Sequence, residues 1–354
     1  MFHDITIENF RGIQSLRLEQ LGHVNLFVGE NNCGKTSVLE SFFLLTGLSN
    51  PQLPIMINTS RGQKNVGDNS LKYLFRGMDL QVSPHFHAVM EGNVERDLSL
   101  SLDKKILLKE KITSDDENAS SHVAAYNARG IKLSFNIEQN HALLAKGDSE
   151  IQIQDDKIVL IPATSSYHET MKGILLPANN ITANLLSQVA ELIKKNRKDI
   201  LIEYARFFDS TITNMEILPD GVYIGYEGLP EMLPLDLSGE GFKKYLSVIA
   251  SVASGLNQIV LIDELENGIH FSAYKKLWNG LIQLASQNGV QLMITTHGKE
   301  LINELSKYLA DTSLPEDFVC VYTLAKTAMQ GMQIYRYTKE GILGSIEHDM
   351  EIRR

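Results

Sequence analysis

The chain has 354 residues, of which 43% are hydrophobic and 21% charged, and its formal net charge is −10. This composition is typical of a globular protein with one large or two modest domains, and it excludes a mostly disordered chain. No apolar run approaches the roughly 20 residues of a membrane-spanning helix, and the first residues lack a signal-peptide pattern, so we expect a cytoplasmic protein without a membrane partner.

Cysteine content and charge narrow the function classes further. Two cysteines, Cys33 and Cys320, are too few for a disulfide framework or a zinc site. The negative net charge argues against a protein that coats nucleic acid. Residues 194–198 are the best local basic patch, although such a run is more often a solvated helix face. His85 and His87 lack partners on their predicted strand, so we assign them no metal role.

Three strands are predicted before the first motif. Residues 2–10 alternate between apolar and polar side chains, which predicts a strand with one buried face, and a second strand is expected near 16–18. Residues 24–28 form a short apolar run typical of a buried strand. The opening of the chain therefore predicts three strands followed by a loop and a helix.

The loop after the third strand carries the central motif. Its sequence, Gly-Glu-Asn-Asn-Cys-Gly-Lys-Thr at residues 29–36, matches the phosphate-binding P-loop, and residues 37–45 are compatible with a helix. A glycine-rich turn before a helix is the alternative interpretation, which the strand–loop–helix context disfavours. The motif therefore indicates a nucleotide site.

Each part of the P-loop has an expected chemical role. Gly29 and Gly34 let the backbone curl so that N–H groups at the helix start face phosphate oxygens. Lys35 is expected to reach the β- and γ-phosphates, and the Thr36 hydroxyl to ligate Mg²⁺. The expected nucleotide-binding residues of this segment are Gly29, Glu30, Asn31, Asn32, Cys33, Gly34, Lys35, Thr36 and Ser37. ATP and Mg²⁺ are the expected cofactors.

The middle of the chain predicts a long loop, a β-rich region and a helical region. Residues 49–70 have the composition of a loop. Alternating runs then predict an antiparallel β subdomain with a flexible polar tip at 114–121. The expected strands are 86–90, 98–102, 106–112, 131–137 and 151–161. Helical spacing from 183 to 208 predicts a helical lobe, followed by a hairpin with strands at 214–218 and 222–226.

Two further motifs follow the helical lobe. Ser238 and Gly239 precede a helix expected from about 243 to 254, and a hydroxyl, a permissive glycine and free helix amides can bind phosphate. Alone, the segment is more typical of a serine-capped helix with a glycine-rich turn. Residues 258–262 predict a buried parallel strand that ends in Asp263 and Glu264, a Walker B pattern. Asp263 would hold the Mg²⁺ hydration shell, and Glu264 would orient and deprotonate the attacking water.

The last part of the chain adds one more candidate residue. A helix is expected at 272–286, and a second buried strand at 290–296 ends in His297. A histidine at a strand end is usually a surface residue, but three nucleotide motifs in order favour a role at the nucleotide. A helix to about 309 and strands at 318–324 and 332–337 complete the predicted elements.

These motifs resemble the ABC-type ATPase heads of SMC, RecF and OLD (overcoming lysogenisation defect) proteins. The resemblance rests on the opening Ile-Glu-Asn-Phe-Arg-Gly at residues 7–12, the P-loop and its strand, and the later segments, and it covers about 1–48 and 230–310. It implies that 237–242 is the ABC signature, with Glu240 at its second glycine, and that 265–270 is the D-loop. His297 resembles the H-loop histidine, which hydrogen-bonds the γ-phosphate and holds the attacking water in line.

The resemblance also implies an architecture. The expected fold class is α/β: a P-loop NTPase with an ABC-type ATPase head over residues 1–354, containing a core parallel sheet, an antiparallel β subdomain and a helical lobe with the signature. Its nucleotide-binding core would be 1–48 and 255–340, its β subdomain 71–175 and its helical lobe 180–254. Two heads would form a homodimer around two ATPs, each site completed by the other head's Ser238 and Gly239, and Arg11 is counted among the nucleotide-binding residues.

Two functions from different classes fit this architecture. In the first, the dimer controls a separate nuclease or toxin effector, as in OLD-like phage-defence ATPases; we expect the chain to be the ATPase half, without the Toprim domain of OLD nucleases. In the second, it is a RecF- or SMC-like ATPase of DNA repair or recombination, with DNA as a candidate ligand. The acidic charge favours the first. A third function, as the nucleotide-binding subunit of a transporter, is less well supported, because such subunits lack the Asn-Phe-Arg opening.

Overall fold

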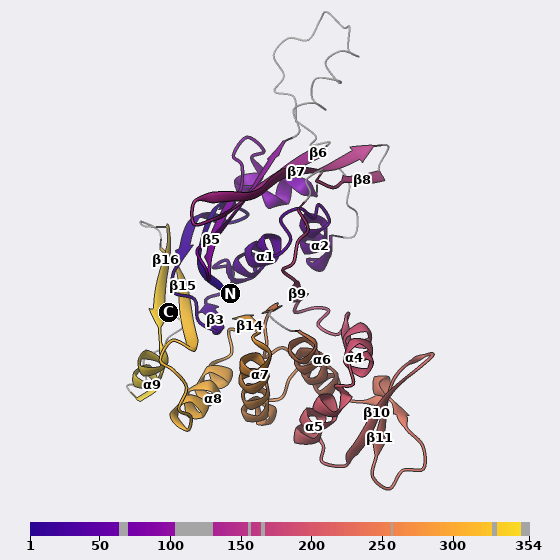
Figure 1. Ribbon diagram of the computed structural model, residues 1–354. Helices are drawn as coiled ribbons and strands as arrows, with labels where there is room; N and C mark the ends of the chain where they lie inside the picture. Colours follow the sequence, from indigo (N-terminus) through magenta and orange to yellow (C-terminus); the bar gives the residue numbers. More distant parts are fainter. Residues whose placement is uncertain are drawn as a thin grey trace, which may run out of the picture. The chain divides into compact units, whose positions relative to one another are not determined.

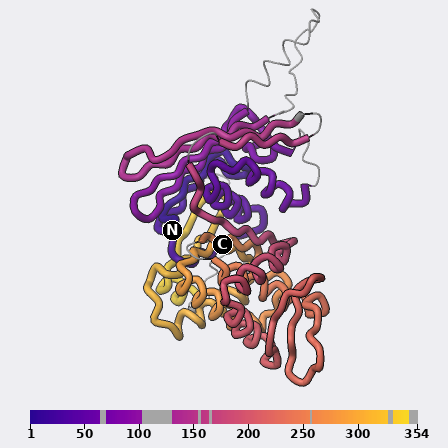
Figure 2. Tube along the Cα trace, turned by 45° about the vertical axis from the view of Figure 1, so that its right-hand side comes forward, coloured from indigo at the N-terminus to yellow at the C-terminus, as the bar shows by residue number. Residues whose placement is uncertain are grey.

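The computed structural model describes residues 1–63, 70–102, 130–154, 157–163, 167–255, 258–327 and 331–347, with the elements labelled in Figure 1. The chain forms two compact units. The first consists of Met1, Gln20–Leu39 and Met171–Arg354, and the second of Phe2–Glu19 and Glu40–Thr170. Within the first unit, segments that are distant in sequence run side by side: residues 24–29, near the indigo end of the chain, pair with residues 292–295 and 319–324 of its orange and yellow parts (Figure 2).

A six-stranded sheet forms the centre of the first unit. Its order is β16-β15-β3-β14-β13-β9, and all neighbouring pairs are parallel except β15 and β16. The strands are β3 (Val24–Gly29), β9 (Gly173–Leu176), β13 (Ile259–Ile262), β14 (Gln291–Thr295), β15 (Val319–Thr327) and β16 (Gly331–Tyr337). β3, β13 and β14 are buried along their whole length, which is why their sequences are nearly continuous apolar runs. The carboxyl ends of these three strands carry the nucleotide motifs.

Helices and a small sheet complete the first unit. The helices are α4 (Leu185–Lys194), α5 (Lys198–Phe208), α6 (Glu240–Ser254), α7 (Tyr274–Asn288), α8 (Lys299–Ala310) and α9 (Lys339–Glu347), with short 3₁₀ turns η3 (Leu235–Leu237) and η4 (Phe271–Ala273). The small sheet contains β10 (Ile212–Leu218), β11 (Gly221–Tyr226) and β12 (Leu233–Pro234). Helix α1 (Lys35–Leu45) starts in this unit and ends in the second.

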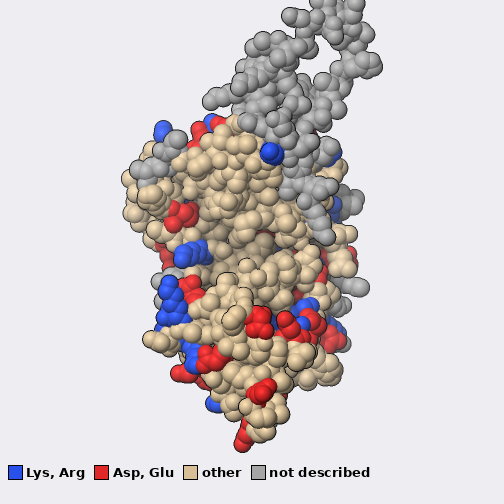
Figure 3. All heavy atoms as spheres, turned by 90° about the vertical axis from the view of Figure 1, so that its right-hand side faces the viewer, with Lys and Arg blue, Asp and Glu red and all other residues tan. Residues whose placement is uncertain are grey.

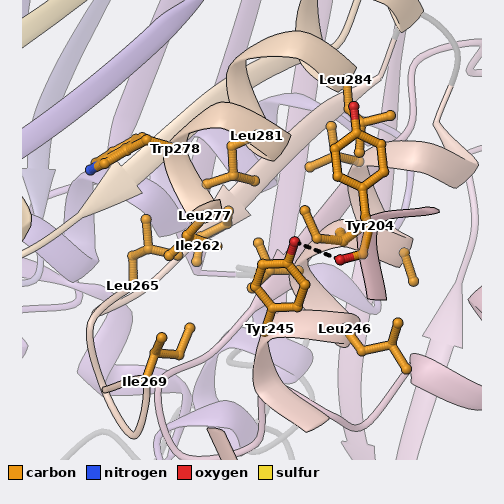
Figure 4. Close-up of a cluster of buried hydrophobic side chains, with 14 of the residues drawn as sticks. Tyr204, Tyr245, Leu246, Ile262, Leu265, Ile269, Leu277, Trp278, Leu281 and Leu284 are labelled. Atoms are coloured by element: carbon orange, nitrogen blue, oxygen red, sulfur yellow. Dashed lines mark hydrogen bonds between the residues drawn. The ribbon is translucent and has the colours of Figure 1, made fainter. Parts of the chain in front are cut away.

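The core of the first unit lies between α5, α6, α7 and β13 (Figure 4). Tyr245 is fully buried and donates its hydroxyl hydrogen to the carbonyl oxygen of Tyr204 at 3.0 Å, so burying the ring leaves no unpaired polar group. Trp278 likewise donates to the carbonyl oxygen of Leu301 at 2.9 Å, which ties α7 to α8. Each such large side chain contributes about 1.5–3 kcal/mol by its burial. The helices next to the nucleotide motifs are therefore firmly packed.

The second unit is built on a seven-stranded antiparallel sheet of order β2-β1-β4-β5-β6-β7-β8. Its strands are β1 (Phe2–Phe10), β2 (Ile13–Leu18), β4 (His85–Met90), β5 (Val94–Leu102), β6 (Gly130–Gln139), β7 (Ala142–Gln154) and β8 (Lys157–Ile161). Helix α2 (Leu53–Ser60) and the 3₁₀ turns η1 (Leu71–Leu74) and η2 (Arg76–Met78) belong to the same unit. Alternate side chains of β1 and β5 are buried, as the alternating sequence predicts.

The structure differs from the sequence-based expectation at several elements. Residues 49–70 were expected to form a loop, but α2 occupies part of them, because Pro54 in its first turn is compatible with a helix start. β1 and β2 were expected in the nucleotide-binding core, yet β1 pairs with β4 of the antiparallel sheet. β9 pairs with β13 although it falls within the range expected for the β subdomain. The strand expected at 106–112 and the tip at 114–121 lie outside the described residues.

Helix α9 was not predicted, since residues 339–347 show weak apolar spacing. Within the described part of the chain, none of the helices combines the length and the apolar character needed to cross a bilayer.

Candidate functional site

The P-loop connects the end of β3 to the start of α1 and has the backbone conformation that its glycines permit. Gly29 and Gly34 have φ angles of 144° and 99°. A Cβ atom at Gly29 would lie 2.3 Å from the carbonyl oxygen of Leu324 and 2.8 Å from the sulfur of Cys33, so no other residue fits there. Cys33 is buried against this turn and fills space rather than reaching the surface. The loop is thus shaped by its own residues and by β15.

Lys35 is the first residue of α1, and its ammonium group folds back over the loop. The side chain is buried, and Nζ donates to the carbonyl oxygens of Gly29 at 2.9 Å and Glu30 at 2.8 Å. The first amides of a helix have no intrahelical acceptor and carry its partial positive charge. The ammonium group and these amides together form a site suited to phosphate oxygens.

Thr36 and Asp263, which are 227 positions apart in the sequence, meet in this site. The Thr36 hydroxyl lies 3.0 Å from Oδ1 and 3.1 Å from Oδ2 of Asp263, which directly follows β13. Asp263 is buried. A hydroxyl beside a buried carboxylate is the set of hard oxygen ligands that Mg²⁺ prefers. These two residues therefore fit the Mg²⁺ role expected of them.

Thr295 is a residue of the site that the sequence analysis missed. It ends β14, is fully buried, and donates from its hydroxyl to Oδ1 of Asp263 at 2.6 Å. The same hydroxyl oxygen accepts the backbone N–H of Glu264 at 2.8 Å. A signal was present, because Thr295 is a hydroxyl residue at the end of an otherwise apolar buried strand. Thr295 therefore links the carboxylate of Asp263 to the backbone of Glu264.

Glu264 has an unusual backbone conformation. Its φ angle is 50°, in the left-handed region, which costs a non-glycine residue roughly 1–2 kcal/mol. Two hydrogen bonds hold the turn: the one from Glu264 N to Thr295, and one from Leu265 N to the Thr295 carbonyl oxygen at 3.1 Å. Strained residues that persist in this way are concentrated at functional sites. The strained turn thus directly follows Asp263, and the Glu264 side chain within it is half-buried.

His297 follows β14 and pairs with Glu266, a second residue to which the sequence analysis gave no role. The His297 backbone N–H donates to Oε1 of Glu266 at 2.7 Å, and Nδ1 of the ring lies 3.0 Å from the same oxygen. The His297 side chain is 49% exposed, whereas that of Glu266 is 9% exposed. The exposed histidine is therefore held in place by a nearly buried carboxylate.

The signature residues lie at the start of α6. Ser238 N donates to the carbonyl oxygen of Leu235 at 2.9 Å, and the Gly239 carbonyl oxygen accepts from the amides of Phe242 and Lys243. Glu240, which replaces the second glycine of the signature, is the first residue of the helix and forms an ion pair with Lys243. A carboxylate in a first helical turn is stabilised by the helix dipole.

Arg11 belongs to the second unit and already has partners there. Its Nη2 donates to Oε1 of Glu40 at 3.1 Å and to Oδ1 of Asn58 at 3.1 Å. Burial lowers the pKa of Arg11, and the charge of Glu40 opposes that shift. The contact of Arg11 with nucleotide therefore stays a prediction.

Comparisons with known proteins agree with the motifs. Residues 24–303 match the family described as "AAA domain, putative AbiEii toxin, Type IV TA system". A Helicobacter pylori protein named ATP/GTP phosphatase is 22% identical over 339 residues, 88% of this chain and 89% of its own length. The DNA replication and repair protein RecF of Streptococcus gordonii is 22% identical over 258 residues, 69% of this chain and 66% of its own length.

Among solved structures, an SMC head bound to the C-terminal winged-helix domain of ScpA aligns with 96% of this chain and 98% of its own, at a TM-score of 0.49 and 8% identity. The family match spans most of the chain and includes the P-loop, Asp263, Glu264 and His297. The chain belongs to this AAA-domain family of ABC-type P-loop ATPases, which is related to RecF.

Proposed function

We propose that the protein binds and hydrolyses ATP, and that its nucleotide-gated dimer controls a partner effector. The observation that carries this proposal is the meeting of Lys35, Thr36 and Asp263 in one unit, with Glu264 beside them. The name of the Helicobacter pylori relative, an ATP/GTP phosphatase, supports hydrolysis of a nucleoside triphosphate.

The residues divide the reaction among them. Lys35 and the amides at the start of α1 bind the β- and γ-phosphates, while Thr36 and Asp263 hold Mg²⁺. When bound, this ion would neutralise charge on the phosphate oxygens. Glu264 accepts a proton from the water whose oxygen attacks the γ-phosphorus, and the bond to the β-phosphate oxygen breaks, releasing ADP and phosphate. His297 orients that water or the γ-phosphate.

We propose that two copies dimerise through Ser238 and Gly239, and the environment of Gly239 supports this. Its φ angle of −62° suits any residue, and a Cβ atom there would have no neighbour within 4 Å. Nothing in its own backbone or its immediate surroundings requires glycine. A glycine at such a position is useful where another surface comes close, and the γ-phosphate bound to a second copy is the ligand that we propose.

The family description names a putative toxin and a toxin–antitoxin system, and this two-component context supports a function that involves a second protein. The alternative, a DNA-binding ATPase of repair or recombination, is favoured by the RecF relative. The net charge of −10 favours the first proposal. On the face of the molecule in Figure 3, Asp and Glu side chains lie mainly in the lower part, where Lys and Arg side chains are interspersed with them.

Two variants test the hydrolysis. Glu264→Gln keeps the phosphate and Mg²⁺ ligands, so we expect ATP binding to persist and turnover to fall by about 10²-fold or more. Lys35→Ala removes a phosphate ligand and should abolish binding. Fluorescent-nucleotide titration and phosphate release measure the two quantities. Wild-type turnover by Glu264→Gln would show that Glu264 is not the base.

Light scattering tests the dimer, and a DNA assay separates the two functions. ATP should increase the mass of Glu264→Gln from one chain to two, and Ser238→Arg in that background should prevent it; unchanged mass would contradict gating by nucleotide.

With plasmid DNA, we expect negligible cleavage and weak, salt-sensitive binding. Tight binding that persists at high salt would favour the repair function.

A further inference from the structure

The pairing of Glu266 with His297 goes beyond the roles that the motifs assign. Glu266 lies two residues after Glu264, in the loop that follows β13, and it contacts His297 through Oε1 alone: this oxygen accepts the His297 backbone N–H at 2.7 Å and lies 3.0 Å from ring atom Nδ1. Two contacts from one residue to the same carboxylate oxygen fix both the backbone and the ring of the histidine.

The loop that carries Glu266 is itself fixed. Leu265 and Ile269, on either side of it, are buried and extend into the core beside α6 and α7 (Figure 4). The other end of the pair is held as well, because α8 starts two residues after His297 and accepts a hydrogen bond from Trp278 of α7. The distance between Glu266 and His297 is therefore set by the packed core.

The surroundings of Glu266 have features that packing alone does not explain. Its Oε2 is buried and has no hydrogen-bond partner among the described residues, an unfavourable arrangement for a carboxylate. Space for the side chain depends on Gly298, where a Cβ atom would lie 3.3 Å from Cγ of Glu266. The negative charge also acts on Tyr274 of α7, whose pKa is raised first by burial and then by Glu266 and Glu300. A nearly buried carboxylate with one unsatisfied oxygen calls for an explanation beyond packing, and a role at the site is one.

An ionised carboxylate can only accept hydrogen bonds, so the Nδ1 atom that faces it must carry the hydrogen. A neutral imidazole with hydrogen on Nδ1 has its lone pair on Nε2. We propose that Glu266 is a positioning residue that holds His297 in the Nδ1–H tautomer, so that Nε2 accepts a hydrogen bond from the attacking water. In this tautomer the neutral ring cannot donate from Nε2 to the γ-phosphate. The role toward the attacking water rests on the proposed ATP hydrolysis. The tautomer of His297 does not, because it is a property of the protein without nucleotide.

The tautomer is tested by NMR without any nucleotide. In protein labelled with ¹⁵N-histidine, with the His297 signals identified by their loss in His297→Ala, the neutral ring should show a protonated Nδ1 and an unprotonated Nε2. In Glu266→Leu, which lacks the acceptor, the signals should shift to the Nε2–H form. A wild-type ring in the Nε2–H form, or no shift in Glu266→Leu, would overturn the proposal. This readout stands even if the protein fails to hydrolyse ATP.

Steady-state kinetics test whether the position and tautomer of His297 affect ATP turnover. We expect Glu266→Leu to lower kcat by about 10- to 100-fold with KM within about two-fold, as for other residues that orient a catalytic histidine. Glu266→Gln retains an acceptor oxygen and should recover part of kcat. Glu300→Leu is the matched control: it removes another carboxylate that acts on Tyr274, and kcat should be unchanged.

A double-variant cycle separates positioning from loss of structure. If Glu266 acts through His297, Glu266→Leu combined with His297→Ala should turn over no more slowly than His297→Ala alone. Additive losses would show that Glu266 acts by another route. Gly298→Ala supplies a milder perturbation: it should displace Glu266 by a few tenths of an ångström and lower kcat less than Glu266→Leu does.

Discussion

Two buried carboxylates in the two units have opposite surroundings. In the second unit, Glu40 is 1% exposed and accepts hydrogen bonds from two guanidinium groups, at 3.1 Å from Arg11 and at 2.6 and 3.0 Å from Arg61. In the first unit, Asp263 is 8% exposed and accepts from two neutral hydroxyls, those of Thr36 and Thr295. The negative charge of Glu40 is balanced by the two guanidinium groups. The two hydroxyls satisfy the hydrogen-bonding capacity of Asp263 but leave its negative charge unbalanced.

The difference separates a structural charge from a functional one. A buried charge pair stabilises a fold only if both partners stay, because either one alone would be left desolvated. A buried carboxylate with neutral donors retains its affinity for a cation from solution. The contrast therefore predicts that substitution of Glu40 changes stability, and that substitution of Asp263 changes activity.

The largest effect is expected for Glu40→Gln. The neutral amide leaves the charges of Arg11 and Arg61 without their counter-ion, so the free energy of unfolding should fall by about 3–5 kcal/mol. Urea unfolding followed by circular dichroism measures it. A triple variant with apolar residues at positions 11, 40 and 61 is the control, since it removes all three charges and should recover most of the loss. A loss below about 1 kcal/mol in Glu40→Gln would mean that the cluster is not structural.

A smaller but more selective effect is expected for Asp263→Asn. The amide oxygen can still accept hydrogen bonds from the Thr36 and Thr295 hydroxyls, so the free energy of unfolding should change by no more than about 1 kcal/mol. Removal of the charge should lower Mg²⁺-dependent turnover by about 10²-fold or more. Phosphate release across a Mg²⁺ titration, with urea unfolding alongside, measures both. If Asp263→Asn unfolded as readily as Glu40→Gln, the contrast between the two carboxylates would fail.

The smallest effect is expected for Asp97, a half-exposed carboxylate of the second unit. His85 lies 3.4 Å and His87 2.9 Å from its Oδ1. Burial acts to raise the pKa of Asp97, but the hydrogen bonds from the two histidines prevail and lower it. The hydrogen bond with Asp97 is the main cause that raises the pKa of His85.

These two shifts define a pH window. The raised pKa of His85 stabilises the fold below the ordinary histidine value of 6.5, and this contribution is lost as pH rises through the folded pKa. The lowered pKa of Asp97 stabilises the fold above 3.8, and this is lost as pH falls. Asp97→Asn should therefore lower the free energy of unfolding by less than about 1 kcal/mol, and the loss should be larger at pH 5.5 than at pH 8.5. Unfolding at the two pH values measures it, and an equal loss at both would exclude the ion pair.

The sequence by itself determined the parts of the site that are continuous in the chain. The P-loop, the strand that ends in Asp263 and Glu264, and the strand before His297 are recognisable because glycine conformations, buried strands and helix starts depend on neighbouring residues. The alternating strands at 86–90, 98–102 and 131–137 follow from the same local rule, whereas the single strand expected at 151–161 is divided between the end of β7 and β8, and the segment at 106–112 lies outside the described residues.

Only the tertiary structure decided which of these parts meet. Thr295 reaches Asp263 from 32 positions away and Glu266 reaches His297 from 31, and both contacts depend on β13 and β14 being parallel neighbours. The pairing of β1 with β4 likewise depends on where the chain returns after α2. Strand order is set by the packing of whole elements, which no single segment encodes.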